Sequence, residues 1–311
     1  MAEAISSDYL EPYIVPPRAS PHKQTFIILH GRGSSGDKFG TVLLGTPVST
    51  REQTDSPISD ETLACLFPHA RFVFPSAARR RATIYKRSYT HQWFDNWALD
   101  PPATDREELQ NAGLRETTIY LHELIRREIR LVPGNNSKNV VLGGLSQGCA
   151  AALIALLLWD GEPLGAAFGM CGWLPHAYRM CQQLESERDE GPGASDGDDP
   201  FDPFEREPGD GEEMEDEDST SPKDKAIRWL REEIGLPSNH VFPHTDVCQD
   251  IPLFLGHGTE DDRVPIDLGR LSFRCLRDMG IRIQWREYEG LGHWYSPIML
   301  RDIIDSTPLL N

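Results

Sequence analysis

The chain has 311 residues, of which 39% are hydrophobic and 26% are charged, and its formal net charge is -18. This length suits one large α/β domain or two small ones, and the hydrophobic content is sufficient for a buried core. A negative balance disfavours nucleic acid as a partner. The longest apolar run, Cys149 to Trp159, is too short to cross a bilayer. We therefore expect no transmembrane segment and no nucleic-acid partner, while transient contact with a membrane surface is compatible with these features.

The amino-terminal sequence and the cysteines indicate the compartment. Residues 1–20 lack a basic stretch followed by an apolar stretch, so they do not resemble a secretory signal. The six cysteines form no Cys-x-x-Cys pair and have no metal-type spacing. This pattern is typical of free thiols in a reducing compartment. We expect a cytoplasmic protein, possible also in the nucleus, with no metal site.

One segment carries most of the charge. Between Glu185 and Asp218 there are 17 Asp and Glu residues against two Arg, a net charge of -15 that leaves only -3 for the rest of the chain. The segment is rich in Gly and Pro and poor in aliphatic residues, so it cannot bury enough surface to offset chain entropy. We predict an N-terminal tail over residues 1–22 and a single domain over 23–311, interrupted at about 183–222 by a disordered acidic insertion.

Strands and helices alternate along the rest of the chain. Short apolar, β-branched runs predict strands, and longer amphipathic or Ala/Leu-rich runs predict helices. The expected strands are Lys23 to Leu29, Arg71 to Pro75, Asn139 to Leu145, Leu164 to Met170, Ile251 to Gly256 and Ile281 to Tyr288. The expected helices are Asp105 to Val132, Gln147 to Trp159, Pro222 to Ile234, Ile266 to Met279 and Pro297 to Ile304. This alternation predicts an α/β fold with a mostly parallel central sheet and helices on both faces.

The most informative motif lies where a predicted strand ends at glycines and a helix begins. Gly144, Ser146 and Gly148 fit a nucleophile elbow, in which a serine adopts a strained backbone conformation while flanking glycines let strand and helix approach. The pentapeptide alone is weakly specific, and a Gly-Ser loop between two buried elements is the alternative. The apolar strand before it and the helix after it favour the elbow, which predicts a serine hydrolase.

A serine hydroxyl requires a base, and the base requires a carboxylate that fixes its tautomer. His293 follows the predicted strand that ends at Tyr288, in a glycine-flanked loop, and is our candidate base. The candidate acid follows the strand that ends at Gly256. The register after His257 and Gly258 favours Asp261. The alternatives in the same stretch are Asp262, as runner-up, Glu260 and Asp267.

Ester hydrolysis also requires hydrogen-bond donors for the oxyanion of the tetrahedral intermediate. The backbone N–H of Gln147, directly after the serine, is one natural donor. The second is an N–H in the glycine-rich loop from His30 to Gly36, for which Arg32 is the best candidate. We interpret His30 itself as a structural histidine that bonds within the loop.

Several motifs together resemble one family, the acyl-protein thioesterase and lysophospholipase-type carboxylesterases of the α/β-hydrolase superfamily. The resemblance covers roughly Lys23 to Ile304 apart from the insertion. The matching runs occur in the family's order: Leu29-His-Gly-Arg-Gly33, Phe74-Pro75, Trp93-Phe-Asp95, Gly143 to Gly148, Cys171-Gly-Trp-Leu-Pro175, His257 to Pro265 and Gly292-His293.

The resemblance implies an α/β-hydrolase fold and an esterase that needs no cofactor, with Ser146, Asp261 and His293 as its catalytic triad. It also implies substrates with medium to long acyl chains, such as S-palmitoylated cysteines or lysophospholipids. It places Trp93 and the pair Trp173-Leu174 near the pocket mouth, where they would bind the acyl chain; the alternative is that the tryptophans belong to the core.

Three features depart from the family pattern. Trp294 and Tyr295 follow the candidate base where small or polar residues are usual, and Asp262 replaces a common proline. The acidic segment is foreign to compact members.

Two further alternatives concern function. Thioesters, oxyesters and lysophospholipids are not distinguished by the sequence. The alternative from a different functional class is a non-catalytic interaction protein. It would use the hydrolase fold as a scaffold and the acidic segment to bind partners. Finally, the basic residues 79–81 and 86–87 could associate with the acidic segment and shade the pocket, or both could be solvated loops that do not meet.

Overall fold

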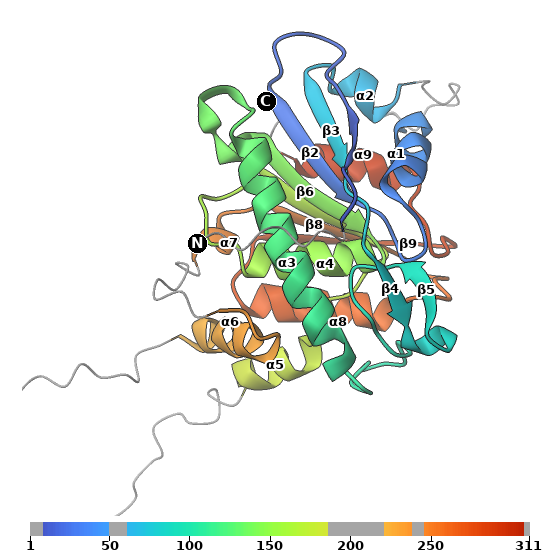
Figure 1. Ribbon diagram of the computed structural model, residues 1–311, viewed down its shortest axis with the longest axis vertical. Coiled ribbons are helices and arrows are strands. Elements are labelled where there is room, and N and C mark those ends of the chain that lie inside the picture. The colour runs from blue at the N-terminus through green and yellow to red at the C-terminus, as the bar shows by residue number, and fades with distance from the viewer. Residues whose placement is uncertain (1–8, 50–60, 186–220, 238–245, 308–311) are drawn as a thin grey trace, which may run out of the picture.

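The computed structural model describes residues 9–49, 61–185, 221–237 and 246–307. Within these ranges the chain forms a seven-stranded sheet in the order β1-β3-β2-β6-β7-β8-β9 (Figure 1). All neighbouring strands are parallel except β1, which runs antiparallel to β3. The bounds are β1 Tyr13–Val15, β2 Gln24–Leu29, β3 Ala70–Phe74, β6 Val140–Leu145, β7 Ala166–Met170, β8 Leu253–Gly258 and β9 Ile283–Tyr288.

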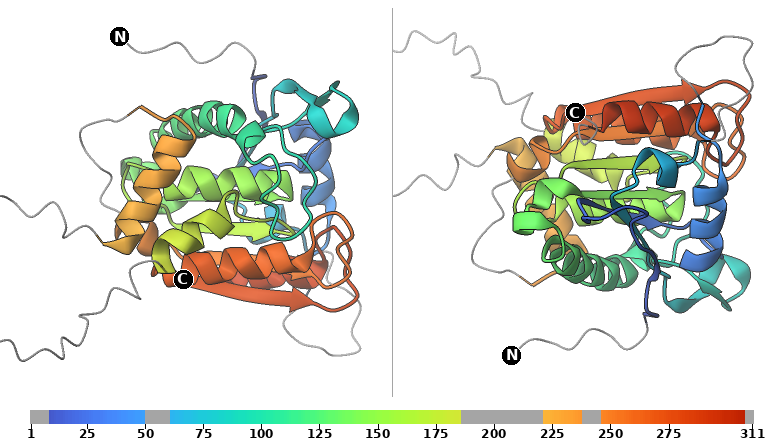
Figure 2. Two further views of the ribbon diagram at one scale, coloured as in Figure 1. Left: turned by 90° about the horizontal axis from the view of Figure 1, so that it is seen from below. Right: turned by 90° about the horizontal axis from the view of Figure 1, so that it is seen from above.

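Helices cover both faces of the sheet, as the two views of Figure 2 show. Short 3₁₀ turns connect some elements, at Thr83–Tyr85, Pro133–Asn135 and Ser137–Asn139. The α-helices are α1 Gly36–Gly45, α2 Leu63–Leu66, α3 Glu108–Ile129, α4 Gln147–Leu157, α5 Ala177–Glu185, α6 Pro222–Glu233, α7 Asp246–Gln249, α8 Ile266–Asp278 and α9 Pro297–Ser306.

The period of two along a strand divides the core into two layers. In β2, Ile27 and Leu29 belong to a cluster with side chains of α3, α4 and α8, whereas Phe26 and Ile28 belong to a cluster with side chains of α1, α2 and α9. Because both faces of the sheet are covered, β2 is apolar at four consecutive positions, from Phe26 to Leu29, rather than at alternate ones.

Burial on all sides also accounts for the composition of helix α4. Every one of its residues is buried, because it lies in the core cluster between the sheet and α3. A helix buried on all sides has no polar stripe, which is why the run after Ser146 contains Ala and Leu rather than an amphipathic pattern.

The predicted fold class and the predicted strands and helices are confirmed, with boundaries that shift by one to three residues. The amino-terminal tail is a correction. Residues 13–15 form β1 and pair with β3, and the ring of Tyr9 stacks on Tyr120 with centroids 4.0 Å apart. Part of the predicted tail is therefore an edge strand of the sheet, which short apolar segments can form when a neighbouring strand offers free backbone groups.

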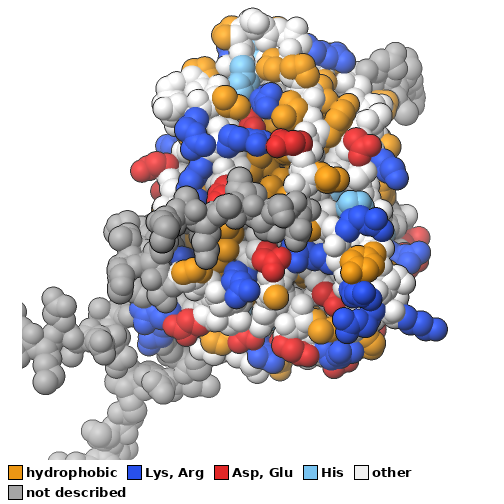
Figure 3. Space-filling view, viewed as in Figure 1, with side chains coloured by type: hydrophobic (Ala, Val, Ile, Leu, Met, Phe, Trp, Pro, Cys, Tyr) orange, Lys and Arg blue, Asp and Glu red, His pale blue; other side chains and the backbone are white. Residues whose placement is uncertain are grey.

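The basic residues after β3 form a hairpin rather than an irregular loop. Strand β4 (Arg79–Ala82) pairs antiparallel with β5 (Ser88–His91). Arg80 turns inward to Glu116 and Tyr9, while Arg79 and Arg81 remain exposed. Figure 3 shows Lys and Arg side chains gathered where this hairpin lies in Figure 1.

The acidic insertion falls almost entirely on residues 186–220, outside the described residues, so its predicted disorder and its association with the hairpin stay predictions. Its flanks are ordered: residues 183–185 end α5, and Pro222 begins α6. In the described part of the chain, no helix has both the length and the apolar character needed to span a membrane.

Candidate active site

Ser146 lies at a sharp turn between β6 and α4, with φ 58° and ψ -124°. A side chain at either flanking glycine would collide with backbone. A Cβ at Gly144 would lie 2.4 Å from the carbonyl carbon of Gly148, and one at Gly148 would lie 2.5 Å from the carbonyl oxygen of His30. The glycines thus permit the close approach of strand, helix and loop that holds the serine in its strained conformation.

A continuous chain of hydrogen bonds joins three side chains that are far apart in the sequence. His293 Nε2 lies 2.9 Å from Ser146 Oγ, and His293 Nδ1 lies 2.8 Å from Asp261 Oδ2. Because Nδ1 faces a carboxylate that only accepts, it carries the proton, and Nε2 is left to accept from the serine hydroxyl. The imidazole is therefore oriented to take the proton of Ser146.

Asp261 is held as an anion by several donors. Its Oδ1 accepts from the backbone N–H groups of Arg263 and Val264 at 2.9 and 2.8 Å, and its Oδ2 also lies 3.2 Å from His257 Nε2. Burial opposes ionisation, but the hydrogen bonds from His257, His293 and Val264 outweigh it, so the pKa of Asp261 lies well below its ordinary value.

The other acidic candidates near Asp261 are placed differently. The Asp262 side chain is 78% exposed and lies 3.6 Å from Arg263, and Asp267 bonds to Arg270. Glu260 is exposed. Of the four acids weighed from the sequence, only Asp261 contacts the imidazole of His293 in the structure.

The loop after β2 is fixed by His30, as the sequence predicted. His30 Nδ1 donates to Gly31 O at 2.7 Å, and Nε2 accepts from the N–H of Ala77 at 3.0 Å. Burial lowers the pKa of His30 to about 4, which keeps the ring neutral. Gly31 follows directly, and a Cβ added to it would lie 3.3 Å from the Cβ of Ser146. The backbone of this loop therefore runs beside the nucleophile.

Arg32 and Gln147, whose N–H groups are the two predicted oxyanion donors, line the same cavity as Ser146, the first on this loop and the second at the start of α4. The N–H of Gln147 is at the first helical position, where no intrahelical carbonyl is available to accept from it. Their role is taken up below as a proposal.

The Gln147 side chain has a structural task that sequence reasoning missed. Its Oε1 accepts from the N–H of Trp93 at 3.0 Å, and its Nε2 donates to Phe94 O at 2.7 Å and to Asn96 Oδ1 at 3.0 Å. All of these groups are buried. The residue after the nucleophile therefore fixes the segment 93–96 against α4.

A cavity of about 550 Å³ opens at Ser146 and His293. Half of the residues that line it are apolar or aromatic, which suits an acyl chain. Its apolar and aromatic lining is Phe39, Ile84, Tyr85, Trp97, Leu99, Leu145, Trp173, Val264 and Trp294. Ile84 and Tyr85 come from the β4–β5 hairpin, and Trp294 directly follows the candidate base. Trp294 stood out in the sequence as a departure from the family pattern, but the sequence did not predict that the hairpin or Trp97 would line the cavity.

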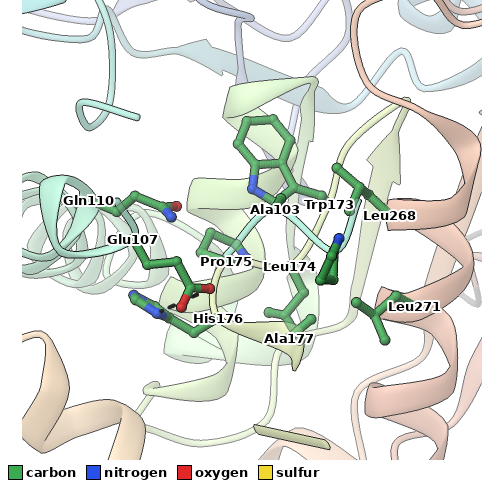
Figure 4. Close-up of a pocket in the computed structure, with 11 residues that line it drawn as sticks. Ala103, Glu107, Gln110, Trp173, Leu174, Pro175, His176, Ala177, Leu268 and Leu271 are labelled. Atoms are coloured by element: carbon green, nitrogen blue, oxygen red, sulfur yellow. Dashed lines mark ion pairs between the residues drawn. The ribbon is translucent and has the colours of Figure 1, made fainter. Parts of the chain in front are cut away.

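Two of the three predicted acyl-site residues do not line this cavity. Trp93 is fully buried, and its Nε1 donates to His30 O at 2.8 Å, so it supports the loop beside Ser146 from within the core. Leu174 lines a separate cavity of about 10 Å³, roughly the space of one water molecule, together with Glu107 and His176 (Figure 4). Trp173 is the one of the three that lines the cavity at Ser146.

A family model described as phospholipase/carboxylesterase matches residues 11–188 and 235–311. The chain belongs to this family. The match begins before β1 and omits residues 189–234, so most of the acidic segment and all of α6 are additions to the family's common domain.

Curated relatives and solved structures carry corresponding names. Acyl-protein thioesterase 1 of Gibberella zeae is 24% identical over 96% of this chain and 95% of its own length. Carboxylesterase SOBER1 of Arabidopsis thaliana is 23% identical over 87% of this chain and 83% of its length. The crystal structure of Zea mays acyl-protein thioesterase 2 matches with a TM-score of 0.60 at 20% identity, covering 96% of this chain and 98% of that one. The fold is therefore that of α/β-hydrolase esterases.

Proposed function

We propose that this protein is a serine hydrolase that cleaves acyl thioesters or carboxylic esters through an acyl-enzyme intermediate. The observation that carries the proposal is the hydrogen-bond chain from Ser146 Oγ through His293 to Asp261, at 2.9 and 2.8 Å, at the wall of a cavity large enough for an acyl chain. Membership of the phospholipase/carboxylesterase family supports it.

Each side chain takes one role in the proposed reaction. Ser146 Oγ attacks the carbonyl carbon of the substrate as His293 Nε2 accepts the hydroxyl proton, and the carbonyl oxygen becomes the oxyanion. The N–H groups of Arg32 and Gln147 donate to that oxyanion. When the intermediate collapses, the proton passes from His293 to the leaving thiolate or alkoxide, and Ser146 retains the acyl group.

Deacylation repeats these steps with water. His293 takes a proton from the water molecule as its oxygen attacks the acyl carbon, and then returns the proton to Ser146 Oγ as the carboxylic acid leaves. Asp261 stays ionised throughout, in line with its lowered pKa, and stabilises the imidazolium that forms in each half. No cofactor enters either half of this reaction.

The cavity and the names of the relatives support a proposal for the substrate class. Relatives are named as acyl-protein thioesterases and as a carboxylesterase. We propose an acyl ester, an S-acylated protein or an S-acylated lipid as substrate, with Trp173 and the hairpin side chains around the acyl chain. Each buried methylene would contribute about 0.8 kcal/mol. A lysophospholipid is the second candidate, because the same apolar wall accepts its single acyl chain.

We also propose one catalytic domain in the cytoplasm. All six cysteines are free thiols, including four that are buried, and burial raises the pKa of Cys149 and Cys171. A fold with unreacted thiols in its core suits a reducing compartment.

The test is turnover of p-nitrophenyl esters from acetate to octanoate by the wild type and by Ser146→Ala. We expect activity that rises with chain length and is lost in the variant. Activity that does not rise from acetate to octanoate would refute the acyl cavity. Activity that survives in Ser146→Ala, or is absent from the wild type, would refute the proposed function and favour a hydrolase-fold scaffold. A palmitoyl-cysteine peptide tested beside a lysophospholipid then separates the two substrate classes.

A further inference from the structure

Among the described residues that line the cavity, Arg32 is the one strong cation whose side chain is partly buried. The other cation of the wall, Arg263, has a side chain that is 72% exposed and lies 3.6 Å from Asp262. Arg32 instead follows Gly31 beside the nucleophile, and its guanidinium carbon lies 5.7 Å from the centroid of the Tyr85 ring. It therefore places a partly buried positive charge beside Tyr85 in the wall of the cavity.

The guanidinium of Arg32 forms no ion pair among the residues that the structure describes, although Tyr85 and the Asp95 carboxylate interact with it favourably. Its Nε is buried there without a hydrogen-bond acceptor, and the ion pairs among those residues do not include it. The carboxylate of Asp95 is engaged by the N–H and hydroxyl of Thr83. Burial lowers the pKa of Arg32, which reports the cost of a charge taken partly out of water.

An arginine with a free Nε edge matches one kind of ligand. The Nε–H and one Nη–H point in parallel, so they bind the two oxygens of a carboxylate or phosphate together. The guanidinium lies over the Tyr85 ring and also interacts with the Tyr85 hydroxyl, while its Nε–H has no acceptor among the described residues. The buried, unpaired donor would then be satisfied when an anionic substrate enters the cavity.

We propose that the Arg32 side chain is a specificity determinant that binds a carboxylate or phosphate carried by the substrate while the acyl carbonyl lies at Ser146. This inference rests on the proposed esterase activity and adds a substrate class to it: amphiphilic esters or thioesters with an anionic group. The apolar wall holds the chain, and Arg32 holds the charge. The backbone N–H of Arg32 serves the oxyanion, so one residue contacts the substrate in two ways.

Two matched substrate pairs locate the anion. The p-nitrophenyl monoester of suberic acid against p-nitrophenyl octanoate places a carboxylate on the acyl side. Decanoyl lysophosphatidate against monodecanoylglycerol, both below their micellar concentrations, places a phosphate on the alcohol side. The readout is the ratio of kcat/KM for the anionic substrate to kcat/KM for its neutral partner.

For the wild type we expect a ratio above one in at least one pair. We expect Arg32→Leu and Arg32→Gln each to lower that ratio about 10- to 100-fold, the range typical of a charge-assisted hydrogen bond, through KM more than through kcat. Arg263→Leu is the matched control: it removes the exposed cation of the same cavity and should lower the ratio less than threefold.

The outcomes separate this inference from the function on which it rests. If the Arg32 and Arg263 variants lower the kcat/KM ratio equally, the preference would come from the overall positive charge of the cavity, and a specific anion site at Arg32 would be refuted. A wild type that hydrolyses p-nitrophenyl octanoate through Ser146 but prefers the neutral member of both pairs would overturn it as well, without any variant. A wild type that hydrolyses no ester would instead refute the proposed function.

Discussion

The Gln147 side chain allows a quantitative test of how the elbow is held. Gln147→Met keeps the volume of the side chain but removes three buried hydrogen bonds, to Trp93 N, Phe94 O and Asn96 Oδ1. A typical hydrogen bond contributes about 1 kcal/mol net, and a buried group left without a partner costs about 1–3 kcal/mol. We therefore expect the free energy of unfolding to fall by about 3 kcal/mol.

Urea denaturation followed by tryptophan fluorescence measures this change, as a midpoint about 1 M lower at an unchanged slope. Gln182→Met, at an exposed position of α5, is the control and should change stability by less than about 0.5 kcal/mol. A loss below about 1 kcal/mol in Gln147→Met would refute the view that this side chain anchors the segment 93–96.

Three further predictions concern packing, pH and the acidic segment. Gly148→Ala should prevent folding to the active state, because the new Cβ would lie 2.5 and 2.6 Å from two backbone oxygens. Gly45→Ala is the control and should fold normally, because its Cβ would have no atom within 4 Å. Circular dichroism spectra and melting temperatures compare the two variants. Asp261 has a folded-state pKa below its ordinary value of 3.8, so its contribution to stability is present above that pH and declines as the pH falls below it. The stability difference between wild type and Asp261→Asn should accordingly shrink between pH 6 and pH 3, and a difference that grows would contradict this sign. If residues 186–220 associate with the hairpin, deleting them should raise activity at low salt and abolish the salt dependence of activity, because salt screens charges over roughly 8 to 10 Å. Activity that the deletion leaves unchanged at every salt concentration would refute this association.

Local pattern was sufficient for the elbow and for six of the seven strands of the sheet, but not for β1. The apolar run before Ser146 and the Ala/Leu run after it have the periods of a buried strand and a buried helix, and both form within two residues of the predicted bounds. Because parallel strands end at the same edge of a sheet, the position of His293 after a predicted strand also predicted correctly that it lies at the edge where Ser146 lies.

Other parts of the site depend on contacts that a sequence does not encode locally. Asp261 differs from its acidic neighbours only because the turn buries it and aims two backbone N–H groups at it. Trp93 was predicted at the pocket but is in the core, since the orientation of a tryptophan in a loop is decided by distant partners such as His30.

The hairpin is a further example, because β4 reads Arg-Arg-Arg-Ala and β5 reads Ser-Tyr-Thr-His, so neither strand has the alternating apolar residues that signal a strand. The sequence also could not show that the Nε of Arg32 would be left without an acceptor, which depends on where Tyr85 and Asp95 lie after folding.

The central claim is that Ser146 is the nucleophile, activated by the imidazole of His293. Labelling with a fluorophosphonate probe, followed by peptide mass mapping, tests this directly. We predict one probe per chain on Ser146, no labelling in Ser146→Ala, and labelling slowed at least about 100-fold in His293→Ala. Labelling at another residue, or labelling of Ser146 at an unchanged rate without the histidine, would contradict it.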